Sequence, residues 1–152
     1  MSTRHLRRTD TFHPQLRREG NLMSTNYSEL ASERVVNFYE LEQEAVRPGV
    51  VRSGYATDDV MLVMNVLDKD MELRPHVHED FDQLAFITRG EANYFIEDTP
   101  HHMVEGSILL VPAGKYHHIQ PLTDVVHNLD LFCPPRSDYA HLLEHLKIGA
   151  SK

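Results

Sequence analysis

From Val35 onward the chain alternates short apolar runs with turn-forming residues, and this spacing constrains its fold more than any other feature. Such runs, bounded by glycine, proline and aspartate, are typical of β-strands, and many in series indicate a sandwich or small barrel. The predicted strands are 35–41, 50–56, 60–67, 73–78, 83–88, 91–97, 107–112, 116–120 and 124–132. We therefore expect an all-β fold.

The pattern changes to a helical period in the stretch "RSDYAHLLEHLK", residues 136–147. Ser137 is a suitable N-cap for a helix that begins there. The apolar residues that would share one helix face are Tyr139, Leu142, Leu143 and Leu146. We expect a short C-terminal helix packed on the outside of the barrel. A helical turn is also predicted within "NYSELASERV", residues 26–35.

Charge divides the chain into two parts. Five arginines against Asp10 and Glu19 give residues 1–24 a net charge of +3, so the remainder carries −11 of the total of −8. We predict a basic N-terminal tail over 1–24 and a single domain over 25–152. The tail is interpreted as solvated or as lying upstream of a second translation start at Met23, with an interaction arm as the alternative. The acidic body argues against nucleic-acid binding.

The chain contains one cysteine, Cys133, which excludes an intrachain disulfide and fits a reducing compartment. Its start lacks the apolar core of a secretory signal, and no apolar run approaches the roughly 20 residues of a membrane helix. We therefore expect a cytoplasmic protein without a membrane partner.

Two histidines at alternate positions, His76 and His78, are the strongest chemical signal. On a strand they would project from the same face, roughly 6–7 Å apart, and could bind one ion. A third histidine follows the turn "PAG" in "GSILLVPAGKYHHI". His117 and His118 would face opposite sides, and the turn spacing favours His117. The pair His141 and His145 lacks a third ligand nearby and is interpreted as helix-terminus cations.

Two adjacent residues, Asp82 and Gln83, are candidates for the fourth ligand of this site. Gln83 can return to the site on the next strand, and it lies six residues before Gly90. Asp82 is the alternative, but neighbours on a strand cannot both face inward. We favour Gln83. A neutral amide beside three neutral imidazoles would leave a divalent ion its full charge, whereas a carboxylate would cancel half of it.

These motifs resemble the two sequence boxes of the cupins. "HVHEDFDQLAFITRG" matches the first box, with Gln83 in the glutamate position, and "GSILLVPAGKYH" matches the second. The resemblance implies a cupin-type double-stranded β-helix, a jelly-roll barrel, with one divalent metal ion in it. Zinc, nickel, manganese and iron are all compatible. Small cupins also pair, which implies a homodimer.

A second cluster follows in "HNLDLFCPPRSDY". Asp130 and Phe132 share one strand face, and Arg136 follows a rigid pair of prolines. The ending D-x-F-x-P-x-R, together with H-x-H-x4-Q and the later histidine, is similar to the small cupins of pectin and alginate breakdown. Those proteins convert 4,5-unsaturated uronates to linear keto sugars.

That resemblance implies metal ligands at four positions, which are His76, His78, Gln83 and His117. It implies catalytic positions at Asp130, Phe132 and Arg136. We therefore expect a metal-dependent isomerase of a small anionic sugar acid, in which Arg136 binds the carboxylate and Asp130 moves a proton. The alternatives are an Fe(II)-dependent dioxygenase and a non-catalytic ligand-binding module.

Overall fold

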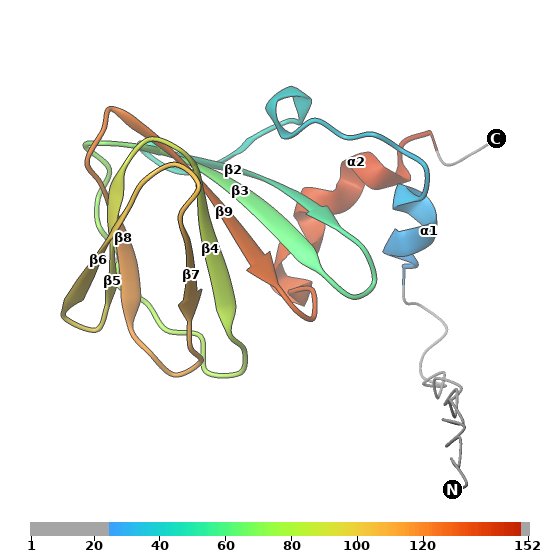
Figure 1. Ribbon diagram of the computed structural model, residues 1–152. Coiled ribbons are helices and arrows are strands. Elements are labelled where there is room, and N and C mark those ends of the chain that lie inside the picture. Colours follow the sequence, from blue (N-terminus) through green and yellow to red (C-terminus); the bar gives the residue numbers. More distant parts are fainter. Residues whose placement is uncertain (1–24, 150–152) are drawn as a thin grey trace, which may run out of the picture.

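The computed structural model describes residues 25–149 and consists mainly of β-strands (Figure 1). One sheet has six strands in the order β1-β2-β3-β9-β4-β7, and the other has three in the order β6-β5-β8. The strands are β1 (Glu44–Arg47), β2 (Val50–Ala56), β3 (Met61–Asp68), β4 (Gln83–Arg89), β5 (Ala92–Ile96), β6 (Thr99–Met103), β7 (Ile108–Val111), β8 (His117–Pro121) and β9 (Val125–Phe132). All paired strands are antiparallel. The predicted all-β class is confirmed.

Two sequence predictions of strands are wrong. Residues 35–41 contain a short 3₁₀ helix, η1 (Phe38–Glu40), in which the Asn37 side chain accepts the Tyr39 amide hydrogen at 3.0 Å. Residues 73–78 form no ladder, and only His76 makes an isolated bridge. Conversely, β1 and β6 were not predicted. β6 contains Pro100 and two histidines, and we interpreted this stretch as a turn. Because β6 is an edge strand, it tolerates a proline.

The two sheets pack face to face around one apolar core. The six-stranded sheet contributes residues such as Leu67, Ile87 and Val126, and the three-stranded sheet contributes Ala92 and Tyr94. Gly90 turns the chain from β4 into β5 with φ of +83°, and a Cβ there would lie 2.4 Å from the Val125 carbonyl oxygen. Only glycine fits this turn between the sheets.

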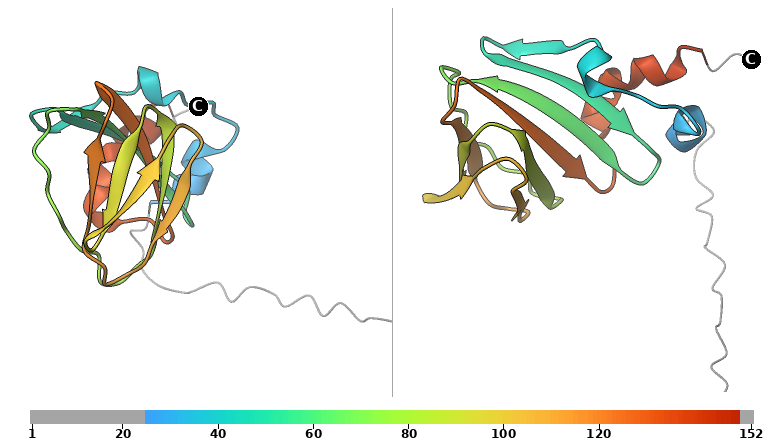
Figure 2. Two further views of the ribbon diagram at one scale, coloured as in Figure 1. Left: turned by 60° about the vertical axis from the view of Figure 1, so that its left-hand side comes forward. Right: turned by 45° about the horizontal axis from the view of Figure 1, so that its top comes forward.

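A second core lies where the long strands meet the helices. These are α1 (Tyr27–Ala31), the 3₁₀ helix η2 (Ser137–Leu143) and α2 (Glu144–Lys147). Figure 2 shows α1 and α2 at the end of β2, β3 and β9, away from the three-stranded sheet. The predicted C-terminal helix is confirmed, with Leu143 and Leu146 buried and Tyr139 and Leu142 partly buried. Ser137 is not its cap, because Arg136 occupies that position.

Close packing and hydrogen bonds hold the C-terminal helix on the sheet. A Cβ at Gly54 would lie 2.8 Å from the Leu142 Cβ, so the helix approaches β2 as closely as only glycine permits. The His145 side chain contacts the Gly54 carbonyl oxygen at 2.8 Å. Arg34 donates to the carbonyl oxygens of Leu146 and Ile148, at 2.6 and 3.2 Å, which supplies partners for the helix end.

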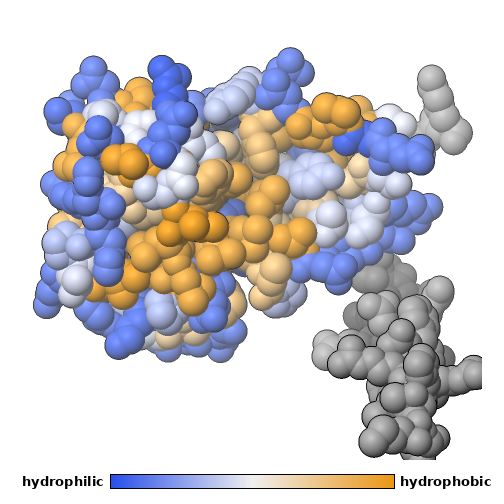
Figure 3. All heavy atoms as spheres, viewed as in Figure 1, coloured by the Kyte–Doolittle hydropathy of each residue, from blue (hydrophilic) through white to orange (hydrophobic). Residues whose placement is uncertain are grey.

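The outer face of the six-stranded sheet carries an apolar patch, visible in Figure 3 over β4, β7 and β9. It surrounds a shallow hollow lined by Leu62, Leu84, Phe86, Ile108, Leu129 and Leu131. Within residues 25–149 we find no helix with the length and apolar character needed to cross a bilayer. The predicted N-terminal tail, 1–24, lies outside the described residues.

Candidate metal centre

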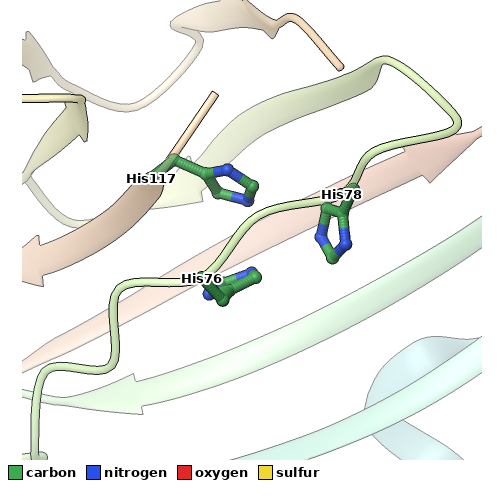
Figure 4. Close-up of side chains that lie close together, drawn as sticks. All are labelled: His76, His78 and His117. Atoms are coloured by element: carbon green, nitrogen blue, oxygen red, sulfur yellow. The ribbon is translucent and has the colours of Figure 1, made fainter. Parts of the chain in front are cut away.

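Three histidines converge at one end of the space between the sheets. Figure 4 shows the rings of His76, His78 and His117 turned toward one another, the first two from an extended segment and the third from β8. One ring nitrogen of each lies within 4.8 Å of the others. The ring centroids are 4.3 to 5.0 Å apart. Three nitrogen ligands at this separation could bind one divalent ion.

Backbone pairing, rather than a continuous strand, brings the two histidine segments together. His76 and His117 exchange amide hydrogen bonds of 3.0 and 2.8 Å, which form the isolated bridge. The Gly114 amide donates to the His78 carbonyl oxygen at 2.8 Å. The turn "PAG" therefore lies directly against the H-x-H segment, although that segment has no ladder of its own.

Hydrogen bonds to the backbone orient two of the imidazoles. Nδ1 of His76 lies 3.0 Å from the Arg74 carbonyl oxygen, and Nδ1 of His117 lies 2.9 Å from the Lys115 carbonyl oxygen. Because a carbonyl oxygen only accepts, Nδ1 must carry the hydrogen, which leaves the lone pair on Nε2. Among the described residues, the buried Nε2 of His117 has no partner. It is oriented as a metal ligand would be.

Gln83 lies inside the site, and Asp82 lies outside it. Gln83 is 3% exposed, and its Nε2 donates to Asp130 Oδ1 at 2.7 Å and to the Tyr94 hydroxyl at 3.2 Å. Its Oε1 is buried and finds no hydrogen-bond partner within residues 25–149. Exposed Asp82 instead accepts the Ala113 amide hydrogen at 2.9 Å. The structure therefore places Gln83, not Asp82, toward the barrel interior.

The donor atoms fit a divalent metal ion. Burial, and after it the charge of Arg136, lowers the pKa of His78 to about 4, and burial also lowers the pKa of His117. These imidazoles are therefore neutral at pH 7, the form that binds metal. Two buried acceptors without partners, His117 Nε2 and Gln83 Oε1, would gain a partner in such an ion. That Gln83 is the fourth ligand stays a prediction.

Asp130 lies beside this group and is held by three amide side chains. Its Oδ1 accepts from Gln83 at 2.7 Å and from Asn128 at 2.8 Å, and its Oδ2 accepts from Asn65 at 2.9 Å. The hydrogen bonds favour the charged form, but burial outweighs them and raises the pKa of Asp130 to about 7. Near neutral pH the carboxyl group can therefore both donate and accept a proton.

Phe132 and Arg136 complete this side of the cavity. Phe132 is 2% exposed, and its ring centroid lies 6.2 Å from that of His78. The Arg136 guanidinium lies 3.9 Å from the Tyr139 ring centroid and 5.1 Å from that of Phe132. Its Nε and Nη2 donate to the Asp138 carboxylate at 3.1 and 2.6 Å. Asp138 therefore occupies the two guanidinium donors of Arg136 that we expected to bind a substrate carboxylate.

Comparisons with known proteins identify the fold and its relatives. The family model of the AraC-like ligand-binding domain matches residues 68–134. An RmlC-like cupin from Shewanella frigidimarina superposes with a TM-score of 0.63 at 24% identity, over 71% of this chain and 96% of that one. The chain is a cupin-type domain.

Among cupins, the domain has low-identity homology to KdgF. The pectin degradation protein KdgF of Dickeya dadantii (strain 3937) is 26% identical over 83 residues, which cover 55% of this chain and 76% of that protein. The structure of KdgF from Halomonas sp. has a TM-score of 0.61 and 28% identity, and covers 66% of this chain and 92% of that one. The predicted resemblance is confirmed.

One cavity of about 130 Å³ connects the predicted metal and catalytic residues of this cupin. Six of the seven predicted site residues line it, and the seventh, His117, belongs to the histidine group. His118, which we expected to face away from the site, also lines the cavity. The sequence did not indicate the remaining polar residues of the wall, which are Arg47, Arg52, Asn65, Tyr94, Asn128 and Tyr139. They lie on several strands and in η2, and no local motif connects them.

Proposed function

We propose that this cupin is a metal-dependent isomerase that converts a 4,5-unsaturated uronate, or a similar enolisable carboxylate, to its linear keto form. The observation that carries the proposal is the hydrogen bond between Gln83 and the half-buried Asp130, whose pKa is about 7, beside three convergent imidazoles. Similarity to a protein of pectin degradation supports the same substrate class.

The reaction is an isomerisation, so every atom of the substrate is kept. The ring C1–O bond breaks, the C1 hydroxyl loses its proton to become an aldehyde, and the C5 enol that forms becomes a ketone as C4 gains a proton. A bound divalent ion would act as a Lewis acid toward a substrate oxygen. Asp130 would take a proton from oxygen and return one to carbon.

The remaining residues of the wall would position the substrate and exclude water. Phe132 is buried and supplies an apolar surface beside His78. Arg136 contributes positive charge, and a substrate carboxylate that used its bidentate edge would compete with Asp138. An acidic chain needs local positive charge to attract an anionic substrate, which a divalent ion and arginines would provide.

The variant Asp130→Asn tests this proposal. We expect it to retain metal and to lose about 10²–10⁴-fold in turnover, because the amide preserves the shape but cannot relay a proton. The assay follows loss of the ultraviolet absorbance of the conjugated double bond. Asp82→Asn is the matched control, since Asp82 is exposed and, within residues 25–149, the one hydrogen bond of its side chain is to the Ala113 amide. Full turnover by metal-loaded Asp130→Asn would refute the assignment.

A non-catalytic ligand-binding module is the second candidate, because the matching family model describes a ligand-binding domain. Such a module would bind the uronate and leave its absorbance unchanged. The predicted Fe(II)-dependent dioxygenase would consume oxygen and require iron, whereas an isomerase should accept several divalent ions and ignore oxygen.

The predicted homodimer and cytoplasmic location remain part of the proposal. The exposed, free Cys133 is compatible with a reducing compartment. The mass of the particle in solution tests the dimer, and fractionation of cells tests the location.

A further inference from the structure

Three arginines contribute to the wall of the metal cavity, and two of them are paired with carboxylates. They are Arg47 on β1, Arg52 on β2, and Arg136, which precedes η2. Arg52 Nε lies 2.5 Å from Glu44 Oε2, and Arg136 makes its bidentate pair with Asp138. The positive charge of these two groups is therefore largely compensated within the protein.

Arg47 is different. Across residues 25–149 no carboxylate oxygen lies within ion-pair distance of its guanidinium, and its one hydrogen bond, to the Glu72 carbonyl oxygen, is 3.3 Å long. Its Nε is buried, and no acceptor reaches it in the described part of the chain. A buried donor without a partner is costly, and a charged one more so, which suggests that the acceptor comes from outside the protein.

Position supports the same conclusion. Arg47 ends β1, directly after the irregularity at Ala45 to Arg47 in its pairing with β2, and it lines the same cavity as His76 and His78. Partial burial, and after it the charge of Arg74, lowers the pKa of Arg47, and the Glu72 carboxylate, which lies beyond ion-pair distance, offsets this only in part. An anion in the cavity would relieve both effects.

We infer that Arg47 binds the carboxylate of the ligand, so that the cavity takes a small acid with a carboxylate at Arg47 and an oxygen function at the histidine group. The inference rests on the proposed function only for the kind of acid, a hexuronate. Arg136 then remains with Asp138 and supports the aromatic wall of Phe132 and Tyr139. A guanidinium suits this role, because its planar donors match a carboxylate.

Binding of D-galacturonate and D-galactose to the metal-loaded protein, measured by titration calorimetry, tests the inference. The two sugars differ in the carboxylate, and neither carries the double bond of the proposed substrate. We expect the wild type to prefer galacturonate and Arg47→Gln to bind it about 10- to 100-fold more weakly, with loss of the preference over galactose. Arg47→Lys keeps the charge without the planar fork and should show an intermediate loss.

Arg89→Gln is the matched control, because it removes the same charge from an exposed position outside the cavity. Thermal melting and metal content of each variant establish that fold and metal site are intact. Unchanged galacturonate binding by folded Arg47→Gln, or a wild type that does not distinguish the two sugars, would overturn the inference. If the Arg47-dependent preference is found but unsaturated uronate is not turned over, the isomerase proposal fails and this inference stands.

Discussion

Replacing Gln83 with glutamate tests how the side-chain amide acts on its two neighbours, Asp130 and the predicted metal ion. Gln83 Nε2 lies 2.7 Å from Asp130 Oδ1, so a carboxylate at position 83 would face another carboxylate. Two unit charges about 4 Å apart interact by about 4 kcal/mol at an effective dielectric constant near 20, which corresponds to about three pKa units. Because burial already raises the pKa of Asp130 to about 7, one of the two carboxyl groups would stay protonated at neutral pH.

The expected result is opposite for metal binding and for turnover. A carboxylate ligand would compensate part of the charge of the ion, so Gln83→Glu should bind metal at least as tightly as the wild type. Turnover should fall about 100-fold or more, because Asp130 loses one of its three amide hydrogen-bond donors, meets a second carboxyl group instead, and can no longer both accept and donate a proton. Chelator competition measures the metal affinity, and the absorbance assay measures turnover.

Asp82→Glu is the control for this experiment, since it changes the neighbouring, exposed side chain. Gln83→Ala should weaken metal binding and turnover together, because the buried amide oxygen is lost. Wild-type turnover by metal-loaded Gln83→Glu would show that a neutral residue is not needed at this position. The reasoning about the charge of the ion would then be wrong.

Three further predictions concern stability. Removing the metal with a chelator should lower the melting temperature by roughly 5–10 °C, the effect of a ligand at about 100 times its Kd, and His117→Ala should lack this response. Gly54→Ala should cost about 1–3 kcal/mol in free energy of unfolding, because the new Cβ would lie 2.8 Å from the Leu142 Cβ. Arg34→Met should cost about 1–3 kcal/mol in denaturant titration, because the Leu146 carbonyl oxygen loses its 2.6 Å partner.

Local sequence patterns predicted the strands that carry a clear apolar alternation or run. β2, β3, β4, β8 and β9 lie within a residue or two of their predicted ranges. The segment 73–78 was predicted as a strand from the spacing of runs between turn-forming residues, but the segment contains Pro75 and makes only one bridge, from His76 to His117, so it is an extended connection. The prediction that His76 and His78 point to the same side did not depend on a ladder, because any extended backbone places alternate side chains on one side.

The metal side of the site could be predicted because its residues lie in two short segments with fixed spacing. The rest of the wall depends on the register of strands that are distant in sequence. Asn65 pairs with Asn128 across β3 and β9, and only this pairing brings both amides to Asp130. No single stretch of sequence records that register.

Arg47 shows the same limit for electrostatics. It lies in "RPG", which we interpreted from the sequence as a turn. Whether Arg47 can bind an anion depends on which groups surround it after folding. Arg52 and Arg136 are equally basic in sequence, yet each meets a carboxylate in the structure while the Nε of Arg47 meets none within the described residues. The sequence shows how many arginines the chain has, but not which of them pair with a carboxylate after folding. An anion site requires an arginine that has no such partner. That difference makes Arg47, rather than the more conspicuous Arg136, the stronger candidate for binding the carboxylate.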